Sequence, residues 1–136
     1  MTPKGPPPRP SVKAHRYELP GGWIVLAGKS DDDNDRLSLE VAGQRDHWFH
    51  VHGMPGSHVI LIAHEGEEPS KEVLKQAAAI AAWHSKARTA GVVSVSCTLA
   101  ANVSKPHGAK PGTVHILREK MFKVRPAVPG GEEASR

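Results

Sequence analysis

The sequence predicts an α+β fold, in which one main helix packs on a twisted, mostly antiparallel sheet. Several short apolar runs are separated by turn residues, which indicates strands, and one alanine-rich segment has apolar residues at helical spacing. The chain has 136 residues, 38% of them hydrophobic and 24% charged, so it is long enough for one small hydrophobic core. We therefore expect a single domain.

Four strands are expected first, joined as an antiparallel meander. They occupy residues 22–28, 36–42, 47–52 and 57–63. In the second of them Leu37, Leu39 and Val41 alternate with polar residues, which is the period of a half-buried strand. The polar segment 29–35 contains turn-forming Asp and Asn residues, so we interpret it as the loop of a hairpin between the first two strands.

The main helix is expected to follow these strands. Pro69 and Ser70 favour a helix start, Glu72 places an acid in the first turn, and apolar residues recur at helical spacing until Gly91. The remaining segments alternate again and predict one strand followed by a final pair of strands. These three strands occupy residues 92–98, 113–117 and 120–124.

The two ends of the chain lack the apolar residues that offset the entropy of ordering. We expect residues 1–16, which are rich in proline, and residues 127–136 to be disordered, and residues 17–126 to form the domain. No apolar run approaches the roughly 20 residues of a membrane span and no signal peptide is recognisable, so a cytoplasmic protein is expected. The single cysteine, Cys97, lies in an apolar alternating stretch and is expected to be buried.

Basic residues are concentrated in the last third of the chain. The net charge is +4, but residues 105–125 carry six lysines and arginines against one acid. Such a stretch is the electrostatic footprint of a phosphate-backbone partner, and a solvated surface is the alternative explanation. Within it, prolines and glycines stiffen a loop that carries Lys105 and Lys110, an arrangement that suits a phosphodiester.

An aromatic and histidine-rich run, residues 46–59, offers stacking surfaces for unpaired bases. Trp48, Phe49 and His50 are the candidates. Neighbours on a strand point to opposite sides of the sheet, so one of Trp48 and Phe49 is expected to face the core and the other to be exposed.

A metal site or an enzyme is the alternative interpretation of the same run. His50 and His52 face one side of a strand and form a metal site if His58 or Asp46 supplies a third ligand. A Ser-His-Asp hydrolase would combine Ser57 or Ser85 with His58 and Asp46, but Ser57 lacks the Gly-x-Ser-x-Gly turn of such enzymes.

The order of these segments resembles the NFACT-R domain, an RNA-binding module at the C-terminus of fibronectin-binding-protein-like ribosome quality-control factors. The resemblance covers residues 23–126. Its motifs are GKS at 28–30 with Asn34, Asp46 with WFH at 48–50, PGSH at 55–58, SKAR at 85–88 and KPHGAKPG at 105–112. The first motif departs from the family, because Lys29 and Ser30 replace its Arg-Asn pair and a lysine lacks the bidentate geometry of arginine.

The resemblance implies an RNA-binding function without catalysis, metal or cofactor. The implied partner is tRNA or ribosomal RNA, through an association with the large ribosomal subunit. The chain has no room for the other domains of those factors, so we expect a stand-alone module. The implied RNA-binding residues are Lys29, Asn34, Trp48, His50, Ser57, His58, Lys86, Arg88, Lys105 and Lys110.

Overall fold

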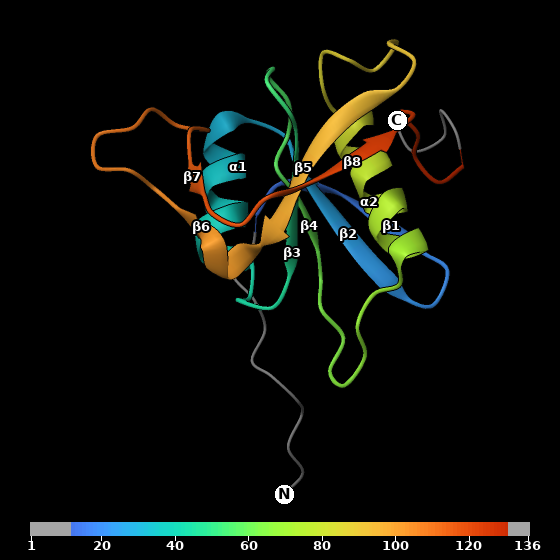
Figure 1. The fold of residues 1–136 in the computed structure, drawn as a ribbon. Helices are drawn as coiled ribbons and strands as arrows, with labels where there is room; N and C mark the ends of the chain where they lie inside the picture. The colour runs from blue at the N-terminus through green and yellow to red at the C-terminus, as the bar shows by residue number, and fades with distance from the viewer. Residues whose placement is uncertain (1–11, 131–136) are drawn as a thin grey trace, which may run out of the picture.

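The computed structural model describes residues 12–130 and contains a six-stranded antiparallel sheet with the strand order β1-β2-β4-β3-β5-β8 (Figure 1). The strands are β1 (Ala14–Leu19), β2 (Trp23–Gly28), β3 (His47–Val51), β4 (Val59–Leu61), β5 (Val93–Leu99) and β8 (Lys120–Val124). A separate two-stranded sheet pairs β6 (Val103–Ser104) with β7 (His115–Ile116). The helical elements are α1 (Asp31–Arg36), a π-helical turn (Leu37–Val41), α2 (Lys71–Trp83) and a 3-10 turn (Ala100–Asn102). The predicted α+β class, with one main helix, is confirmed.

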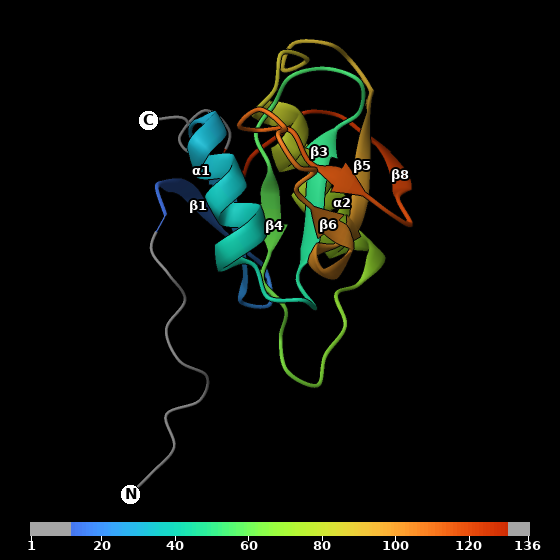
Figure 2. The same cartoon turned by 90° about the vertical axis from the view of Figure 1, so that its left-hand side faces the viewer.

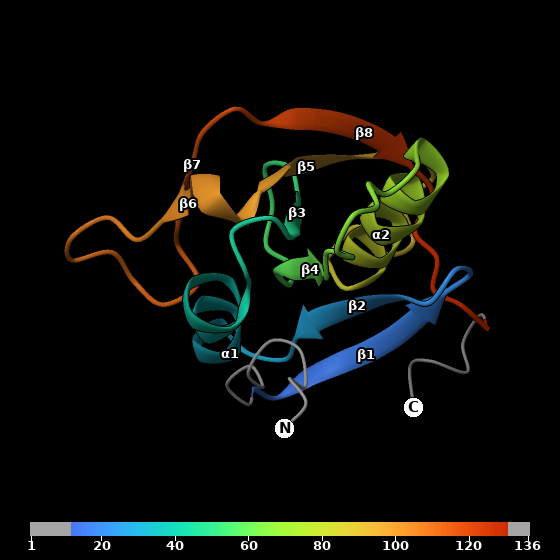
Figure 3. The same cartoon turned by 90° about the horizontal axis from the view of Figure 1, so that it is seen from below.

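Helix α2 fills the concave side of the curved sheet (Figure 3). Its N-cap is Ser70, whose hydroxyl accepts a hydrogen bond from the Val73 N–H at 3.1 Å. Small buried residues such as Ala77 and Ala81 let the helix axis lie close to the strands, where they share the main core with Phe49. In residues 12–130 no helix is long and apolar enough to cross a membrane.

The opposite face of the sheet is also covered. Figure 2 shows α1 and β6 on this side, away from α2. Here Leu37, Trp48 and Ile60 form a second buried cluster, and residues from β6 and β7 pack against it. Because both faces are covered, neighbouring residues of a central strand are buried on opposite sides, and strand β3 has no solvent-exposed face along its middle.

Residues 36–42 do not form the predicted strand, and residues 29–35 are not a hairpin loop. Ser30 is the N-cap of α1, since its hydroxyl accepts from the Asp33 N–H at 3.1 Å, and three aspartates in the first turn complement the helix dipole. The turn that follows buries Leu37 and Val41 but leaves Leu39 exposed. Helical spacing, not strict alternation, therefore describes this segment.

Several strand partners also differ from the prediction. Strand β2 pairs with β1 and β4 instead of a segment at 36–42, so the expected meander is wrong, although β3 and β4 do form a hairpin. The final strands are not partners of each other, because β7 pairs with β6 and β8 pairs with β5. Helix α2 ends at Trp83, well before Gly91.

The ordered domain extends beyond residues 17–126 at both ends. Strand β1 begins at Ala14 inside the segment expected to be disordered, and Tyr17 and Leu19 anchor it in the core. At the other end Val128 is buried, and the Ala127 N–H donates to the carbonyl of residue 79 at 3.2 Å. Residues 1–11 and 131–136 of the two expected disordered segments lie outside the described residues.

Candidate nucleic-acid interface

A cavity of about 420 Å³ lies where three segments distant in the sequence meet. They are the turn after β2, the turn before β4 and the turn after α2, and we call the cavity the basic pocket. Its lining residues are His15, Gly28, Lys29, Ser30, Asp31, Asn34, Pro55, Gly56, Ser57, His84, Ser85, Lys86 and Arg88. Lys29, Lys86 and Arg88 face one lining acid, Asp31, so the pocket has an excess of positive charge.

Backbone and hydroxyl hydrogen bonds hold the three segments together. The Ser57 hydroxyl donates to the Gly28 carbonyl at 2.7 Å, and the Ser57 N–H donates to the His84 carbonyl at 2.8 Å. Gly56 faces Ser85 so closely that a Cβ at residue 56 would lie 2.9 Å from the serine Cβ. Glycine at 56 therefore permits the close approach of two turns that forms the pocket floor.

Asn34 is a structural residue at the edge of this pocket. It is 4% exposed, and its side-chain oxygen accepts the His58 N–H at 3.1 Å. Gly28 lies directly against it, because a Cβ there would be 2.0 Å from the same oxygen. The amide thus joins α1 to the start of β4, and this role differs from the RNA contact that the family resemblance implies.

Two stacked histidines form one wall of the basic pocket. The rings of His15 and His84 have centroids 4.4 Å apart, and the Tyr17 hydroxyl is hydrogen-bonded to His84 Nε2. The pKa of His84 is lowered to about 4, chiefly by burial and to a smaller extent by the neighbouring His15 and Arg88. The pKa of His15 is lowered first by burial and then by Lys29 and Arg88. Both rings are therefore neutral near pH 7.

Arg88 is held on the surface of an aromatic ring. Its Nε donates to the Trp83 carbonyl at 2.7 Å, and its guanidinium carbon lies 4.5 Å from the centroid of the Trp83 ring. This stacking fixes the plane of the guanidinium while its terminal nitrogens remain able to donate. A planar, oriented guanidinium is suited to bidentate binding of a phosphate.

Trp48 and His58 belong to a buried hydrogen-bond network and offer no stacking or charged surface to RNA. Trp48 is 3% exposed and His58 is 2% exposed. The Trp48 Nε1–H donates to the Ser38 hydroxyl at 2.8 Å, and that hydroxyl lies 2.7 Å from His58 Nδ1. His58 Nε2 lies 3.1 Å from the Gly112 carbonyl. Since Phe49 is also fully buried, the expectation that one of the two neighbouring rings is exposed was wrong.

The network fixes the protonation state of His58. A carbonyl oxygen only accepts, so His58 Nε2–H donates to the Gly112 carbonyl. Burial is the main cause that lowers the pKa of His58 to about 4, and the neighbouring His50 is a smaller cause of the same lowering. Nδ1 of the neutral ring carries no hydrogen and accepts from the Ser38 hydroxyl, which itself accepts from the Trp48 indole N–H. His58 is therefore a neutral structural histidine.

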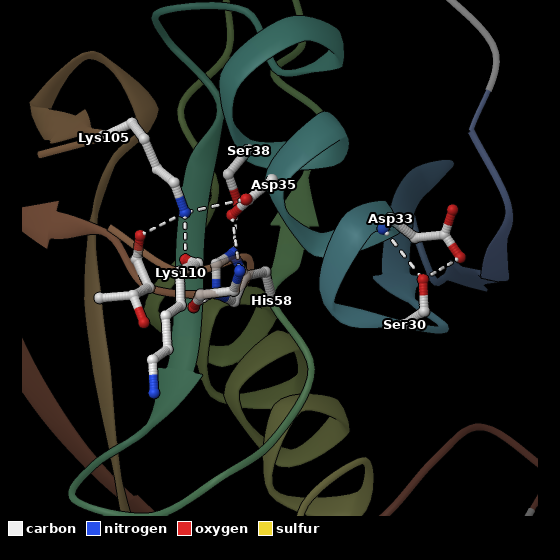
Figure 4. A network of polar contacts seen from close by, with 9 residues as sticks. Ser30, Asp33, Asp35, Ser38, His58, Lys105 and Lys110 are labelled. Atoms are coloured by element: carbon white, nitrogen blue, oxygen red, sulfur yellow. Dashed lines mark hydrogen bonds and ion pairs between the residues drawn. The ribbon is translucent and has the colours of Figure 1, made fainter. Parts of the chain in front are cut away.

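Lys105 holds the loop that was expected to present it to phosphate (Figure 4). Its ammonium donates to Asp35 Oδ2 at 2.9 Å, to the Thr113 carbonyl at 2.9 Å and to the Lys110 carbonyl. The other Asp35 oxygen accepts the Gly112 N–H at 3.0 Å. All three ammonium hydrogens are thus used within the domain, whereas the Lys110 side chain is exposed.

The structure does not assemble the proposed hydrolase. The Ser57 hydroxyl donates to a backbone carbonyl, both ring nitrogens of His58 are engaged elsewhere, and Asp46 accepts the N–H groups of Gly43 and Ala63 at 2.8 Å each. Among the described residues, no group of three or more His, Cys, Asp or Glu side chains is placed to hold a metal ion. Within the described part of the chain, the metal site suggested for His50 and His52 therefore has no third ligand.

Of the residues singled out in the sequence, the basic pocket unites Lys29, Asn34, Ser57, Lys86 and Arg88. His50 lines a different hollow, described below. Sequence reasoning missed the His15–His84 wall, since residue 15 was assigned to a disordered segment and residue 84 to the buried face of a longer helix. The Ser-Lys-x-Arg motif that directly follows His84 is the sequence feature that indicated a functional site near this histidine.

Comparisons with known proteins agree with this architecture. Residues 13–118 match the family described as the NFACT protein RNA binding domain. The chain is 37% identical over 121 residues to the Rqc2 homolog RqcH of Streptococcus suis, covering 84% of this chain and 22% of that protein. It is 39% identical over 110 residues to the Rqc2 homolog RqcH of Bacillus subtilis, covering 81% of this chain and 19% of the relative.

A solved structure, the C-terminal part of the fibronectin/fibrinogen-binding protein from Streptococcus suis, superposes with a TM-score of 0.79 at 38% identity, over 87% of this chain and 47% of that one. The chain spans about a fifth of the length of the curated relatives it matches. The family model covers most of the chain, and this chain belongs to the NFACT protein RNA binding domain family.

Proposed function

We propose that this chain binds RNA, with a backbone phosphate held in the basic pocket by Lys29, Lys86 and Arg88. The observation that carries the proposal is the meeting of three separate motif segments at one cavity with three cations and one acid. Lysine and arginine side chains and nearby backbone groups are the usual partners of nucleic-acid phosphates. Membership of an RNA-binding family supports the same conclusion.

The three cations differ in how they would hold a phosphate. Within residues 12–130, the ammonium groups of Lys29 and Lys86 make no hydrogen bond or ion pair with another residue, so both are available as mobile charges. Arg88 is oriented by Trp83 and supplies geometry as well as charge. Lys110 is exposed on the loop that Lys105 holds, and we include it in the proposed RNA-binding surface.

The RNA we propose is tRNA or ribosomal RNA, bound in the cytoplasm in a process related to ribosome quality control at the large subunit. The relatives named RqcH support this assignment, and the role is one of binding without catalysis.

Filter binding or fluorescence anisotropy with purified tRNA, across a salt series, tests the proposal. Lys86→Ala and Arg88→Gln are expected to weaken binding. Each lost phosphate contact should make the negative slope of log K against log salt shallower by about 0.7 to 0.9. Lys75→Ala is the matched control, because this exposed lysine lies on α2 and does not line the pocket. Equal losses in Lys75→Ala and Lys86→Ala, or an affinity that does not depend on salt, would reject the pocket as the binding site.

A further inference from the structure

A second hollow, of about 320 Å³, lies on the other side of the β3–β4 turn from the basic pocket. The basic pocket uses Pro55 and Ser57 of this turn, whereas the hollow uses the first residues of the turn together with Ser96 in the middle of β5 and the segment 112–116. We call it the strand-end hollow. Its character differs from that of the basic pocket, because it carries a carboxylate and has no lysine or arginine in its lining.

One wall of the strand-end hollow is a hydrogen-bonded group of three side chains. The Ser96 hydroxyl donates to Glu119 Oε2, and His52 Nδ1 lies 3.2 Å from the same hydroxyl oxygen and 3.6 Å from Glu119 Oε2. The serine has one hydrogen to give, so His52 Nδ1–H is the donor toward it. Ser96 is 5% exposed, and these contacts hold the Glu119 carboxylate in a defined position.

The carboxylate nevertheless has acceptor capacity left. Within residues 12–130, Glu119 Oε1 makes no hydrogen bond, and 36% of the side chain is exposed. Its backbone is set by Arg118, a non-glycine residue with a φ of 59° that turns the chain just before it. A fixed carboxylate with free lone pairs, facing a hollow, is a site for a ligand that offers N–H donors.

A flat wall is provided by the His50 ring. It lies nearly parallel to Trp48, at 13° with centroids 6.0 Å apart, and edge-on to His58 at 5.5 Å. Two aromatic neighbours therefore fix its plane. Burial lowers the pKa of His50, so the ring that faces the hollow is a neutral aromatic surface at neutral pH.

We propose that the strand-end hollow binds an unpaired guanine of the bound RNA, stacked on His50 and recognised by Glu119. Guanine presents two adjacent N–H donors, its ring N1–H and its amino group, which match the two acceptors of a carboxylate. Adenine and cytosine place a ring acceptor beside their amino group, and uracil flanks its ring N–H with two carbonyls, so each sets an acceptor against the carboxylate. This inference rests on the proposed function.

The two sites are arranged to act on one RNA chain. They flank the same β3–β4 turn, so a nucleotide strand crossing the turn places a phosphate in the basic pocket and a base in the strand-end hollow. A carboxylate opposes phosphate binding on electrostatic grounds, and its presence beside a basic site is explained if it selects a base.

Anisotropy with two labelled uridine hexamers, one containing a single guanosine and one a single adenosine at the same position, tests this inference. The wild-type protein is expected to prefer the guanosine oligomer by about tenfold, which is within the range of one bidentate base contact. Glu119→Gln should reduce the preference to about twofold or less, because the amide replaces one acceptor by a donor. Glu65→Gln, which removes an exposed carboxylate outside the hollow, should keep the tenfold preference for the guanosine oligomer.

Two further arms separate this inference from the proposed function. Lys86→Ala should weaken the binding of both oligomers and leave the ratio of their affinities unchanged. His50→Ala should weaken the binding of both oligomers without affecting the fold measured by circular dichroism. Failure of every RNA to bind overturns the proposed function. Salt-dependent binding with equal affinity for the two oligomers, or with a ratio that survives Glu119→Gln, overturns the guanine site alone. The guanine site is also overturned if free GMP displaces the labelled oligomers while the protein shows no preference between them, since the hollow would then bind a free nucleotide.

Discussion

His58 should make the stability of the domain depend on pH in the acidic range. Its pKa is 6.5 in an unfolded chain and about 4 in the fold, chiefly because of burial. Below pH 6.5 the unfolded state binds a proton that the folded state does not, so stability is full above this value and falls as the pH drops toward 4. Lowering the pH from about 7 to about 5 should therefore remove about 2 kcal/mol of unfolding free energy through this histidine.

The measurement compares urea unfolding at the two pH values for the wild type and for His58→Gln, which keeps a donor and an acceptor but does not titrate. The loss between the two pH values should be smaller by about 2 kcal/mol in the variant. His84, whose pKa is also lowered to about 4, contributes equally to both proteins and cancels. His107→Gln, at an exposed loop residue, should retain the wild-type dependence.

An independent measurement uses the folded protein alone. The ring resonances of His58 should not shift between about pH 8 and about pH 5, and they should report the Nε2-protonated tautomer. A His58 that titrates near its unfolded value, or equal pH losses in the wild type and His58→Gln, would show that the Ser38–His58–Gly112 network does not hold the ring neutral.

Three other perturbations test the fold. Trp48→Ala and Phe49→Ala should each cost about 3 to 5 kcal/mol of unfolding free energy, because both rings are buried; a small loss for Trp48→Ala would contradict the covered second face. Lys105→Met should open the 105–113 loop to proteolysis, while Lys110→Met should not, and equal cleavage would reject the role of the ammonium in holding the loop. Cys97 is 3% exposed and burial raises the pKa of its thiol to about 12, so a thiol reagent should label it only on unfolding; rapid labelling of the native protein would disprove this burial.

The sequence predicted those elements whose pattern has one interpretation. Helix α2 has its cap, its first-turn acid and its apolar spacing within one segment, β3 is a short aromatic and histidine-rich run, and β5 alternates apolar with small polar residues. The strand prediction for residues 36–42 was wrong because Leu37 and Val41 lie four apart as well as on alternate positions, so the same residues fit a strand and a helix. The N-cap at Ser30 favours the helix.

The site was less predictable because its contacts are long-range. Lys105 and Lys110 look alike in the sequence, and only the position of Asp35, seventy residues away, makes one structural and leaves the other exposed. In the same way, the sequence around Trp48 fits a stacking residue, but the π-helical turn and residues of β6 and β7 cover this face of the sheet and bury the ring. The family motifs, by contrast, singled out Lys29, Lys86 and Arg88, and the fold brings these three residues together in one cavity.

The attachment of Lys105 to Asp35 has a kinetic consequence. A loop that is already held in place before RNA arrives does not need to be ordered during the encounter, so its conformational entropy is not lost at that step. Association should then be governed by diffusion and by electrostatic attraction to the exposed cations, and it should proceed in a single phase whose rate constant falls with ionic strength. If the loop contacts RNA as proposed, the ion pair shifts the entropic cost of ordering it from the binding step to folding.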